Sequence, residues 1–260
     1  MTSVKRLTLA VLLLFMPLLM GQDYGSGIAM VNQQSSIAAQ YTCADPDFAG
    51  ASWCEDFELA NPTDCTDEAV FDTVIIGTPV CNNASVPATS TGAESALIGN
   101  GLTNVELQTT ALGGTITDGS RSYRIVWKRT DRTGGTNIVF FAGRDSNSYE
   151  GFQLRMGTAV VANMSVRNDS TGYTTSTATF TNGVWYKTEI CYDYTNDDTH
   201  VYWMLETEPW VNPTYLWDTG TLNGTNGSAN APDRWLLDSV GTSLEFEVAI
   251  IAEFNDSCTP

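Results

Sequence analysis

The sequence predicts an all-β protein whose strands form an antiparallel two-sheet sandwich. Short runs of alternating apolar and polar residues recur between clusters of turn-forming residues, which is the pattern of half-buried strands. No segment after residue 21 shows the apolar spacing of an amphipathic helix. The length of 260 residues suits one large domain, because all-β sandwiches often reach roughly 200–250 residues.

Residues 1–21 have the pattern of a secretory signal peptide. Lys5 and Arg6 precede an apolar run over 7–20, which is shorter than the about 20 residues of a membrane-spanning helix. Small residues follow from Gly21 onward, so we expect cleavage there and a secreted, extracellular protein with no membrane contact afterwards. A retained anchor helix is the alternative.

Charge restricts the partners of this chain. It has 12 basic and 30 acidic residues, which gives a formal net charge of −18. A surface of this sign repels phosphate backbones, so we expect no nucleic-acid partner. Six Asn-X-Ser/Thr sequons fit a glycoprotein, although the abundance of Asn, Ser and Thr produces several by chance.

The six cysteines fit an exported protein held by disulfides. No C-x-x-C spacing occurs and the chain has one histidine, so a zinc site is not expected. Six cysteines allow 15 pairings, and sequence alone does not choose among them. We expect two short loops near the start and one bond that fastens the last strand: Cys43–Cys54, Cys65–Cys81 and Cys191–Cys258.

Two regions follow the signal peptide. Residues 22–52 are small and polar with weak periodicity, and we interpret them as an extended N-terminal arm. The sandwich domain is predicted over 53–260, starting with a strand at Trp53–Leu59. Gly, Asn, Thr and Ser dominate 220–232, which predicts a surface loop. Further strands are expected over 122–128, 137–143, 152–156, 160–167, 185–194 and 200–206.

The closing strand over 244–254 has the clearest alternation in the chain. The pattern of period two predicts one face in the core and one polar face. The expected core-facing residues are Leu244, Phe246, Val248, Ile250, Ala252 and Phe254.

Four stretches resemble the concanavalin A-like lectin/glucanase superfamily, especially its laminin G-like branch. They are Trp-Cys-Glu-Asp-Phe-Glu at 53–58, the segment 183–193 that begins Gly-Val-Trp and ends Tyr-Asp, the strand 201–205 and the closing strand at 245–250. The resemblance implies a jelly-roll sandwich. Lectins, glycosidases, lyases, adhesion modules and structural subunits share this fold, so the fold leaves the function open.

Two glutamates in the closing strand form an incomplete catalytic pattern. One group of jelly-roll glycosidases carries carboxylates at i, i+2 and i+4 of one strand, because an acid and a nucleophile must flank one glycosidic bond. Glu245 and Glu247 fit the first two positions, but Ala249 occupies the third. We therefore expect no catalytic residues, with Glu245 and Glu247 as the alternative.

Aromatic residues near the 220–232 loop are candidates for ligand binding. Sugar sites often place a ring against the apolar face of a sugar, while amides and carboxylates bind its hydroxyls. The alternative is that the rings fill the core, as tryptophan usually does. The candidates are Trp210, Tyr215, Trp217 and Trp235.

Half of the basic residues outside the signal peptide lie close together, at Arg121, Arg124, Lys128, Arg129 and Arg132. Pairing with the excess acids across strands is one interpretation. A site for an acidic glycan is the alternative.

Calcium is the one cofactor that the sequence suggests, although none is certain. Asp193, Asp197 and Asp198 cluster in one turn, and calcium prefers such oxygen ligands. Asn and Asp also favour turns for purely local reasons, so both interpretations stay open.

The leading hypothesis is a secreted, non-catalytic carbohydrate-binding or adhesion module of the laminin G-like type. Its partner would be a glycan or a cell-surface or matrix component. A glycoside hydrolase or polysaccharide lyase on the same fold is one alternative. Another is a structural subunit of an extracellular filament or surface layer, with self-association through the arm and its apolar residues Ile28, Met30 and Ile37.

Overall fold

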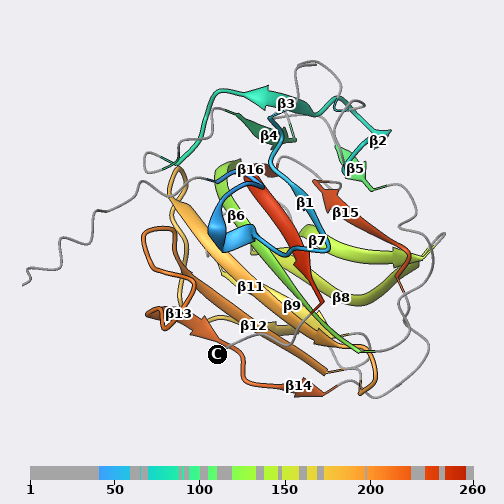
Figure 1. The fold of residues 1–260 in the computed structure, drawn as a ribbon, viewed down its shortest axis with the longest axis vertical. Helices are drawn as coiled ribbons and strands as arrows, with labels where there is room; N and C mark the ends of the chain where they lie inside the picture. Colours follow the sequence, from blue (N-terminus) through green and yellow to red (C-terminus); the bar gives the residue numbers. More distant parts are fainter. Residues whose placement is uncertain are drawn as a thin grey trace, which may run out of the picture. The chain divides into compact units, whose positions relative to one another are not determined.

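Two antiparallel sheets make up the computed structural model, and the prediction of an all-β sandwich is confirmed (Figure 1). The one helical element among the described residues is a 3-10 turn at Pro46–Phe48. The described residues contain no helix that is long and apolar enough to span a membrane. The structure describes residues 41–58, 65, 70–87, 90, 94–99, 105–109, 119–132, 138–145, 148–157, 163–168, 173–196, 198–223, 232–239 and 244–255.

The first sheet has nine strands and contains both the first and the last strand of the sandwich. Strand β1 pairs with β16, and β14 pairs with β12, beside the main path. Along that path the order is β13 (Tyr215–Asp218), β12 (Asp198–Leu205), β11 (Trp185–Asp193), β6 (Ser120–Arg132), β16 (Leu244–Phe254), β4 (Ser95–Ile98) and β3 (Val80–Asn83). The two side strands are β1 (Trp53–Glu55) and β14 (Leu222–Asn223).

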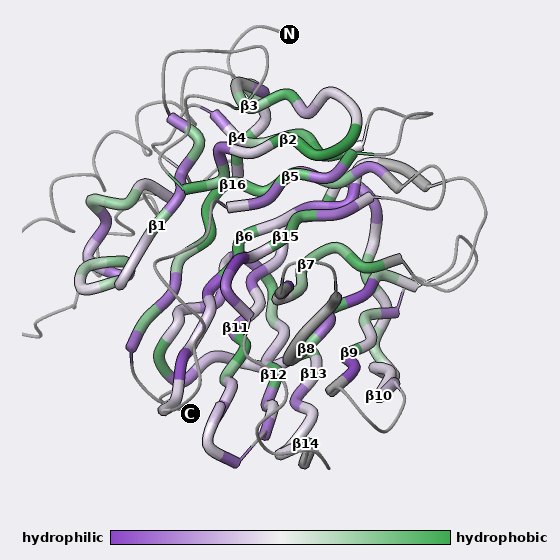
Figure 2. Tube along the Cα trace, turned by 90° about the vertical axis from the view of Figure 1, so that its right-hand side faces the viewer, coloured by the Kyte–Doolittle hydropathy of each residue, from purple (hydrophilic) through white to green (hydrophobic). Residues whose placement is uncertain are grey.

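The second sheet has seven strands and is built from the middle of the chain. Its order is β10 (Tyr173–Thr175), β9 (Met164–Asn168), β8 (Ser148–Met156), β7 (Ile138–Asp145), β15 (Arg234–Asp238), β5 (Glu106–Gln108) and β2 (Thr73–Ile76). Figure 2 shows apolar and polar residues following one another along the strands of both sheets. This alternation lets each strand bury one row of side chains between the sheets.

Aromatic rings dominate the main core between the sheets. The ring of Trp235 lies 4.4 Å from Tyr123 and stacks on Phe141 and Phe152. Each buried ring removes a large apolar area from water and gains about 0.5–1.5 kcal/mol more from such ring pairs. This core joins β6, β7, β8 and β15 across the sandwich.

A second apolar cluster lies on the outer face of the nine-stranded sheet. Tyr41 and Phe48 from the segment before β1 pack there with Trp210, which follows β12. They cover Val126 and Ile250, which are fully buried although they face away from the main core. Much of this outer face is therefore used for folding.

The prediction that one face of β16 carries six core residues is wrong in its second half. A register shift lies between Val248 and Ile250, where β16 pairs with β6. Phe246 and Val248 pack in the main core, as does Ile251, but Ile250 packs in the second cluster. An inserted residue moves the following side chains to the opposite face, so the strand serves both cores.

Candidate functional site

The disulfides fasten the segment before β1 and the edge of the first sheet. Cys43–Cys54 and Cys65–Cys81 are formed as predicted. Cys191 is also disulfide-bonded. Cys258 lies outside the described residues, so its pairing with Cys191 stays a prediction.

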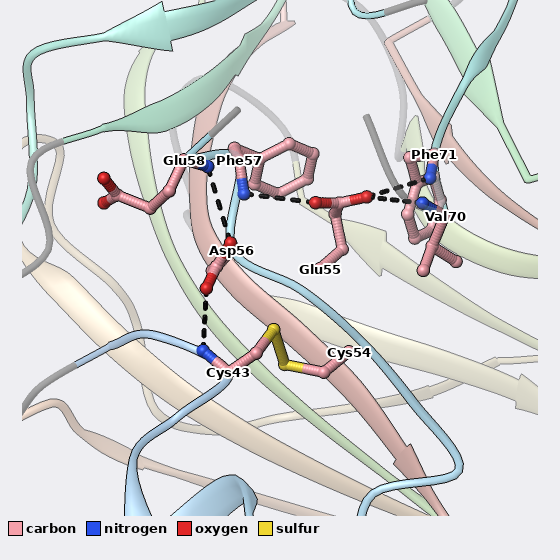
Figure 3. Close-up of a disulfide and its surroundings, with 8 residues drawn as sticks. All are labelled: Cys43, Cys54, Glu55, Asp56, Phe57, Glu58, Val70 and Phe71. Atoms are coloured by element: carbon pink, nitrogen blue, oxygen red, sulfur yellow. Dashed lines mark hydrogen bonds between the residues drawn. A yellow bond between two sulfur atoms is a disulfide. The ribbon is translucent and has the colours of Figure 1, made fainter. Parts of the chain in front are cut away.

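The acidic motif that follows Cys54 has a structural role (Figure 3). The carboxylate of Glu55 accepts hydrogen bonds from the backbone N–H groups of Phe57, Val70 and Phe71. Asp56 accepts the backbone N–H of Cys43 at 2.7 Å. Burial raises the pKa of Glu55, and the three backbone hydrogen bonds oppose that rise. These acids therefore hold the loop and the disulfide in place.

The structure does not bring the four predicted aromatic ligands together. Trp235 lies in the main core and is 1% exposed, while Trp210 lies in the second cluster and is 3% exposed. Trp217 is half-buried against the main core. Tyr215 is half-buried on the outer face of the nine-stranded sheet. One of the four, Tyr215, takes part in a partly open ring cluster.

Tyr215 belongs to a stack of three rings along β12 and β13. Tyr202 lies between His200, 4.2 Å away, and Tyr215, 4.7 Å away. The Nε2 of His200 lies 2.5 Å from the Oδ1 of Asp218. Burial, with the negative charge of Asp218, raises the pKa of Tyr202 to about 12. The stack fastens the edge strand β13 to β12.

The proposed calcium ligands are only partly described. Both carboxylate oxygens of Asp193 already accept hydrogen bonds, from the backbone N–H groups of Thr195 and Asn196 and from the side-chain amide of Asn196. Asp198 starts β12, and Asp197 lies outside the described residues. Across the described part of the chain, no three His, Cys, Asp or Glu side chains gather as a metal site.

Glu245 and Glu247 are both engaged by neighbours on β6. Thr130 donates its hydroxyl to Glu245 at 2.6 Å. The ammonium of Lys128 lies 2.7 Å from Glu247, donates to Ser85 and lies over the Trp185 ring. Glu247 is 5% exposed, so the pair with Lys128 is largely removed from water.

The basic cluster predicted on β6 is paired with neighbouring residues where the structure describes it. Arg124 pairs with Glu189 at 3.1 Å and Arg121 with Glu253 at 3.8 Å. Arg129 lies over the Phe180 ring and bonds to Asn182. The side chain of Arg132 lies outside the described residues. Cross-strand pairing is therefore the interpretation that fits these residues.

The outer face of the seven-stranded sheet carries polar side chains, and we call it the polar sheet face. Strand pairing places one residue from each of the seven strands in a continuous row across it. This row consists of Tyr173, Arg167, Gln153, Ala142, Leu236, Gln108 and Thr73. The main core occupies the opposite side of the same strands, through residues such as Leu154 and Val166.

The polar groups of this face are largely buried. Gln108 and Gln153 are each 7% exposed. Gln153 accepts a hydrogen bond from the guanidinium of Arg155 at 2.8 Å. Each of these two amides contains both a donor and an acceptor of hydrogen bonds.

An ion pair crosses the centre of the polar sheet face. Arg144 on β7 pairs with Glu106 on β5, and β15 lies between these two strands. The pair therefore passes over β15, where Leu236 is fully buried. Arg155, fixed by Gln153, and this bridge give the face positioned donors and acceptors of hydrogen bonds.

One end of the polar sheet face carries an exposed ring. Tyr173, on the edge strand β10, is 39% exposed. The guanidinium carbon of Arg155 lies 4.1 Å from the ring centroid and that of Arg167 lies 5.9 Å from it. The ring is oriented by two cation–π contacts and still presents surface to solvent.

Sequence reasoning missed this face, although the pattern held a signal. Gln153 and Arg155 alternate with apolar residues on β8, and Ser165 and Arg167 do so on β9. This alternation predicts strands, but it does not indicate that some of the polar residues are buried. The long separation of Tyr173 and Gln108 in sequence hid the row, since only the sheet order joins them.

By its fold the chain belongs to the class of all-β two-sheet sandwiches, and its polar face lies on the seven-stranded sheet. No family model matches the sequence, and no curated protein matches it. Among solved structures, the chain is similar to the exoplasmic/lumenal domain of VIP36 in a Ca²⁺/Man2-bound form. The TM-score is 0.45 at 13% identity, over 68% of this chain and 87% of that one.

A second similar structure is that of botulinum neurotoxin type C, whose cell entry is described as dependent upon interaction with two ganglioside molecules. Its TM-score is 0.43 at 7% identity, over 72% of this chain and 44% of that chain. Such distant similarity concerns the fold alone, because one fold serves many functions.

Proposed function

We propose that this chain is a secreted, non-catalytic carbohydrate-binding module of the laminin G-like type, and that the polar sheet face is its binding surface. The observation that carries the proposal is a cross-strand row that contains the buried amides of Gln108 and Gln153 and ends at the exposed ring of Tyr173. Its partner is a glycan, either free or on a cell-surface or matrix component.

The chemistry of this face suits a sugar. A hydroxyl both donates and accepts hydrogen bonds, and the amide of Gln108 offers both functions. The carbon-bound hydrogens of a sugar ring can pack on the face of Tyr173.

A glycan array tests this proposal with matched variants. Gln108→Leu removes the amide at similar volume, and Tyr173→Ala removes the exposed ring. We expect each to weaken binding at least about tenfold, the loss of about 1.4 kcal/mol, at an unchanged melting temperature. Tyr215→Ala, on the opposite sheet, serves as the control. Loss of binding only in Tyr215→Ala would move the site to the ring stack.

A glycoside hydrolase remains the second candidate, because Glu247 pairs with Lys128 beside the partly buried Trp185 ring, and Glu245 lies two residues away on the same strand. Glu247 is tied to Lys128, which suits a structural role better than proton transfer. Incubation with polysaccharides and analysis of reducing ends would separate the two functions. Cleavage by the wild type that is lost in Glu247→Gln, with the fold intact, would favour the hydrolase. A lyase would instead release unsaturated products.

Calcium binding and self-association remain separate proposals. Array binding measured with calcium and again with a chelator tests the metal. Electron microscopy of the native protein tests the filament or surface layer. Light scattering of the secreted protein, with and without residues 22–40, tests self-association through the arm.

A further inference from the structure

We propose that the glycan bound by the polar sheet face is uncharged where it crosses the centre of that face, and that the Arg144–Glu106 ion pair is the element that selects it. This inference rests on the proposed function and names the class of ligand. The centre of the face comprises β7, β15 and β5, which lie side by side in the seven-stranded sheet.

The arginines at the centre of the face are paired with carboxylates of the protein itself. Arg144 pairs with Glu106 across β15, and the side chains of the two residues are 24% and 8% exposed. Arg234 donates hydrogen bonds of 2.6 Å and 3.0 Å to Asp233, and these bonds lower the pKa of Asp233. A sugar carboxylate or sulfate that bound either arginine would therefore have to displace a carboxylate of the protein.

Two buried carboxylates also lie on adjacent strands at the centre. Asp238 on β15 lies directly opposite Glu106 on β5 in the strand register, and the two residues are 2% and 6% exposed. Their side chains point away from the main core, because the neighbouring residues Leu107 and Leu237 pack in it. Residues directly opposite each other have Cβ atoms about 4.5–5.5 Å apart, so an anionic sugar would meet both carboxylates at short range.

An uncharged sugar can bind without breaking any of these pairs. A hydroxyl accepts a hydrogen bond from a guanidinium N–H and donates one to a carboxylate oxygen. Arginine has five N–H donors, so Arg144 can donate to a sugar while it keeps its bond to Glu106. The side-chain amide of Gln108, opposite the fully buried Leu236 in the register, adds a donor and an acceptor.

The charge of the whole chain acts in the same direction. A formal net charge of −18 repels polyanions from the surface. Arg155, nearer the edge of the sheet, is engaged as well, because it donates to Gln153, lies over the Tyr173 ring and makes a further interaction. Long-range repulsion and local pairing therefore both favour an uncharged glycan over an acidic one.

Isothermal titration calorimetry with matched pairs of probes tests the class of ligand. Each pair consists of a neutral hexasaccharide of glucose, mannose, galactose or N-acetylglucosamine and the same chain with its C6 hydroxymethyl groups oxidised to carboxylates. We expect at least one neutral probe to bind, and its oxidised form to bind at least about tenfold more weakly. The affinity for the neutral probe should hardly change with salt concentration, because salt screens only interactions between charges.

A gain of binding identifies the selecting element. Glu106→Gln leaves the Arg144 charge without its carboxylate, so we expect the affinity for the oxidised probe to rise about tenfold. The double variant Glu106→Gln/Arg144→Gln should lose this gain. Glu208→Gln removes the same charge from the segment after β12 in the other sheet, and as the control it should leave the preference unchanged. Melting temperatures show whether each variant keeps its fold.

The outcomes separate this inference from the proposed function. Equal or tighter binding of the oxidised probes by the wild type would overturn the uncharged class while leaving carbohydrate binding intact. No gain in Glu106→Gln at an intact fold, or an equal gain in Glu208→Gln, would overturn the ion pair as the selecting element. An array and a calorimeter that both show no glycan binding would overturn the proposed function itself.

Discussion

At the scale of single residues, buried carboxylates organise this acidic chain. Glu55 collects three backbone N–H groups from two separate segments. Glu253 lies beside Tyr123 and Arg121, where burial raises its pKa while the hydrogen bond from Tyr123 and the charge of Arg121 oppose the rise. The sequence shows these glutamates, but the partners of Glu55 lie up to 16 residues away.

Replacing Glu55 by alanine should destabilise the protein by about 2–4 kcal/mol, because backbone donors of Phe57, Val70 and Phe71 lose their acceptor. Urea unfolding of the two proteins measures the difference. Glu94→Ala is the control, since the described residues make no hydrogen bond to its carboxylate. A cost for Glu55→Ala no larger than that of the control would contradict the assigned role.

Glu253 should make stability depend on pH. Its pKa is raised above the ordinary value of 4.5, so the folded state binds the proton more tightly than the unfolded state does. The contribution of Glu253 to the free energy of unfolding is therefore highest below the ordinary pKa and declines as pH rises through the raised pKa. Glu253→Gln removes this dependence. Unfolding of both proteins at several pH values from about 4 to 7 should show the stability of the wild type falling relative to the variant. A constant difference would refute the assignment.

At the scale of elements, the closing strand β16 shows what the sequence could and could not predict. Its alternation correctly predicted a strand with buried residues such as Phe246. The bulge after Val248 was not predicted, because apolar residues occur on both faces of the strand. Ala249 and Ile251 are therefore compatible with either register. Because the second apolar cluster lies on the outer face, both faces of β16 carry apolar residues. A sequence period of two does not reveal such a second cluster.

Replacement of Phe246 or of Ile250 by alanine should each cost about 2–5 kcal/mol of stability. The two variants should nevertheless destabilise different parts of the protein. Phe246 supports the main core, while Ile250 supports the segment before β1. Amide exchange at Phe48 and Ala51, both hydrogen-bonded in that segment, should accelerate more in Ile250→Ala. Equal acceleration in the two variants would contradict the separation into two cores.

Glu247→Gln should cost about 1–3 kcal/mol, because it leaves the ammonium of Lys128 without its carboxylate in a largely buried site. The alternation of the closing strand places Glu247 on the polar face, where an exposed ion pair would contribute little. Lys128→Met in the same chain should restore part of the lost stability. Thermal unfolding of both single variants and the double variant measures the coupling, and additive losses would show that the pair is not linked.

At the scale of the whole molecule, the two outer faces of the sandwich differ in kind. The nine-stranded sheet carries an apolar cluster that is covered by residues 41–51 and by Trp210. The seven-stranded sheet carries buried amides, arginines and an exposed ring. The sequence predicted the fold class and two disulfides, since alternation and cysteine spacing are local signals. It did not predict the polar sheet face, because seven strands separated along the chain contribute one residue each to its row.

The most direct test of the proposed binding surface is chemical-shift mapping by NMR with a glycan selected on the array. The protein carries labelled tyrosine rings and glutamine side-chain amides. Titration should shift the resonances of Tyr173, Gln108 and Gln153 together, with one dissociation constant, while those of Tyr202 and Tyr215 stay in place. Shifts confined to Tyr202 and Tyr215, with the amides of Gln108 and Gln153 unmoved, would contradict the polar sheet face as the binding site.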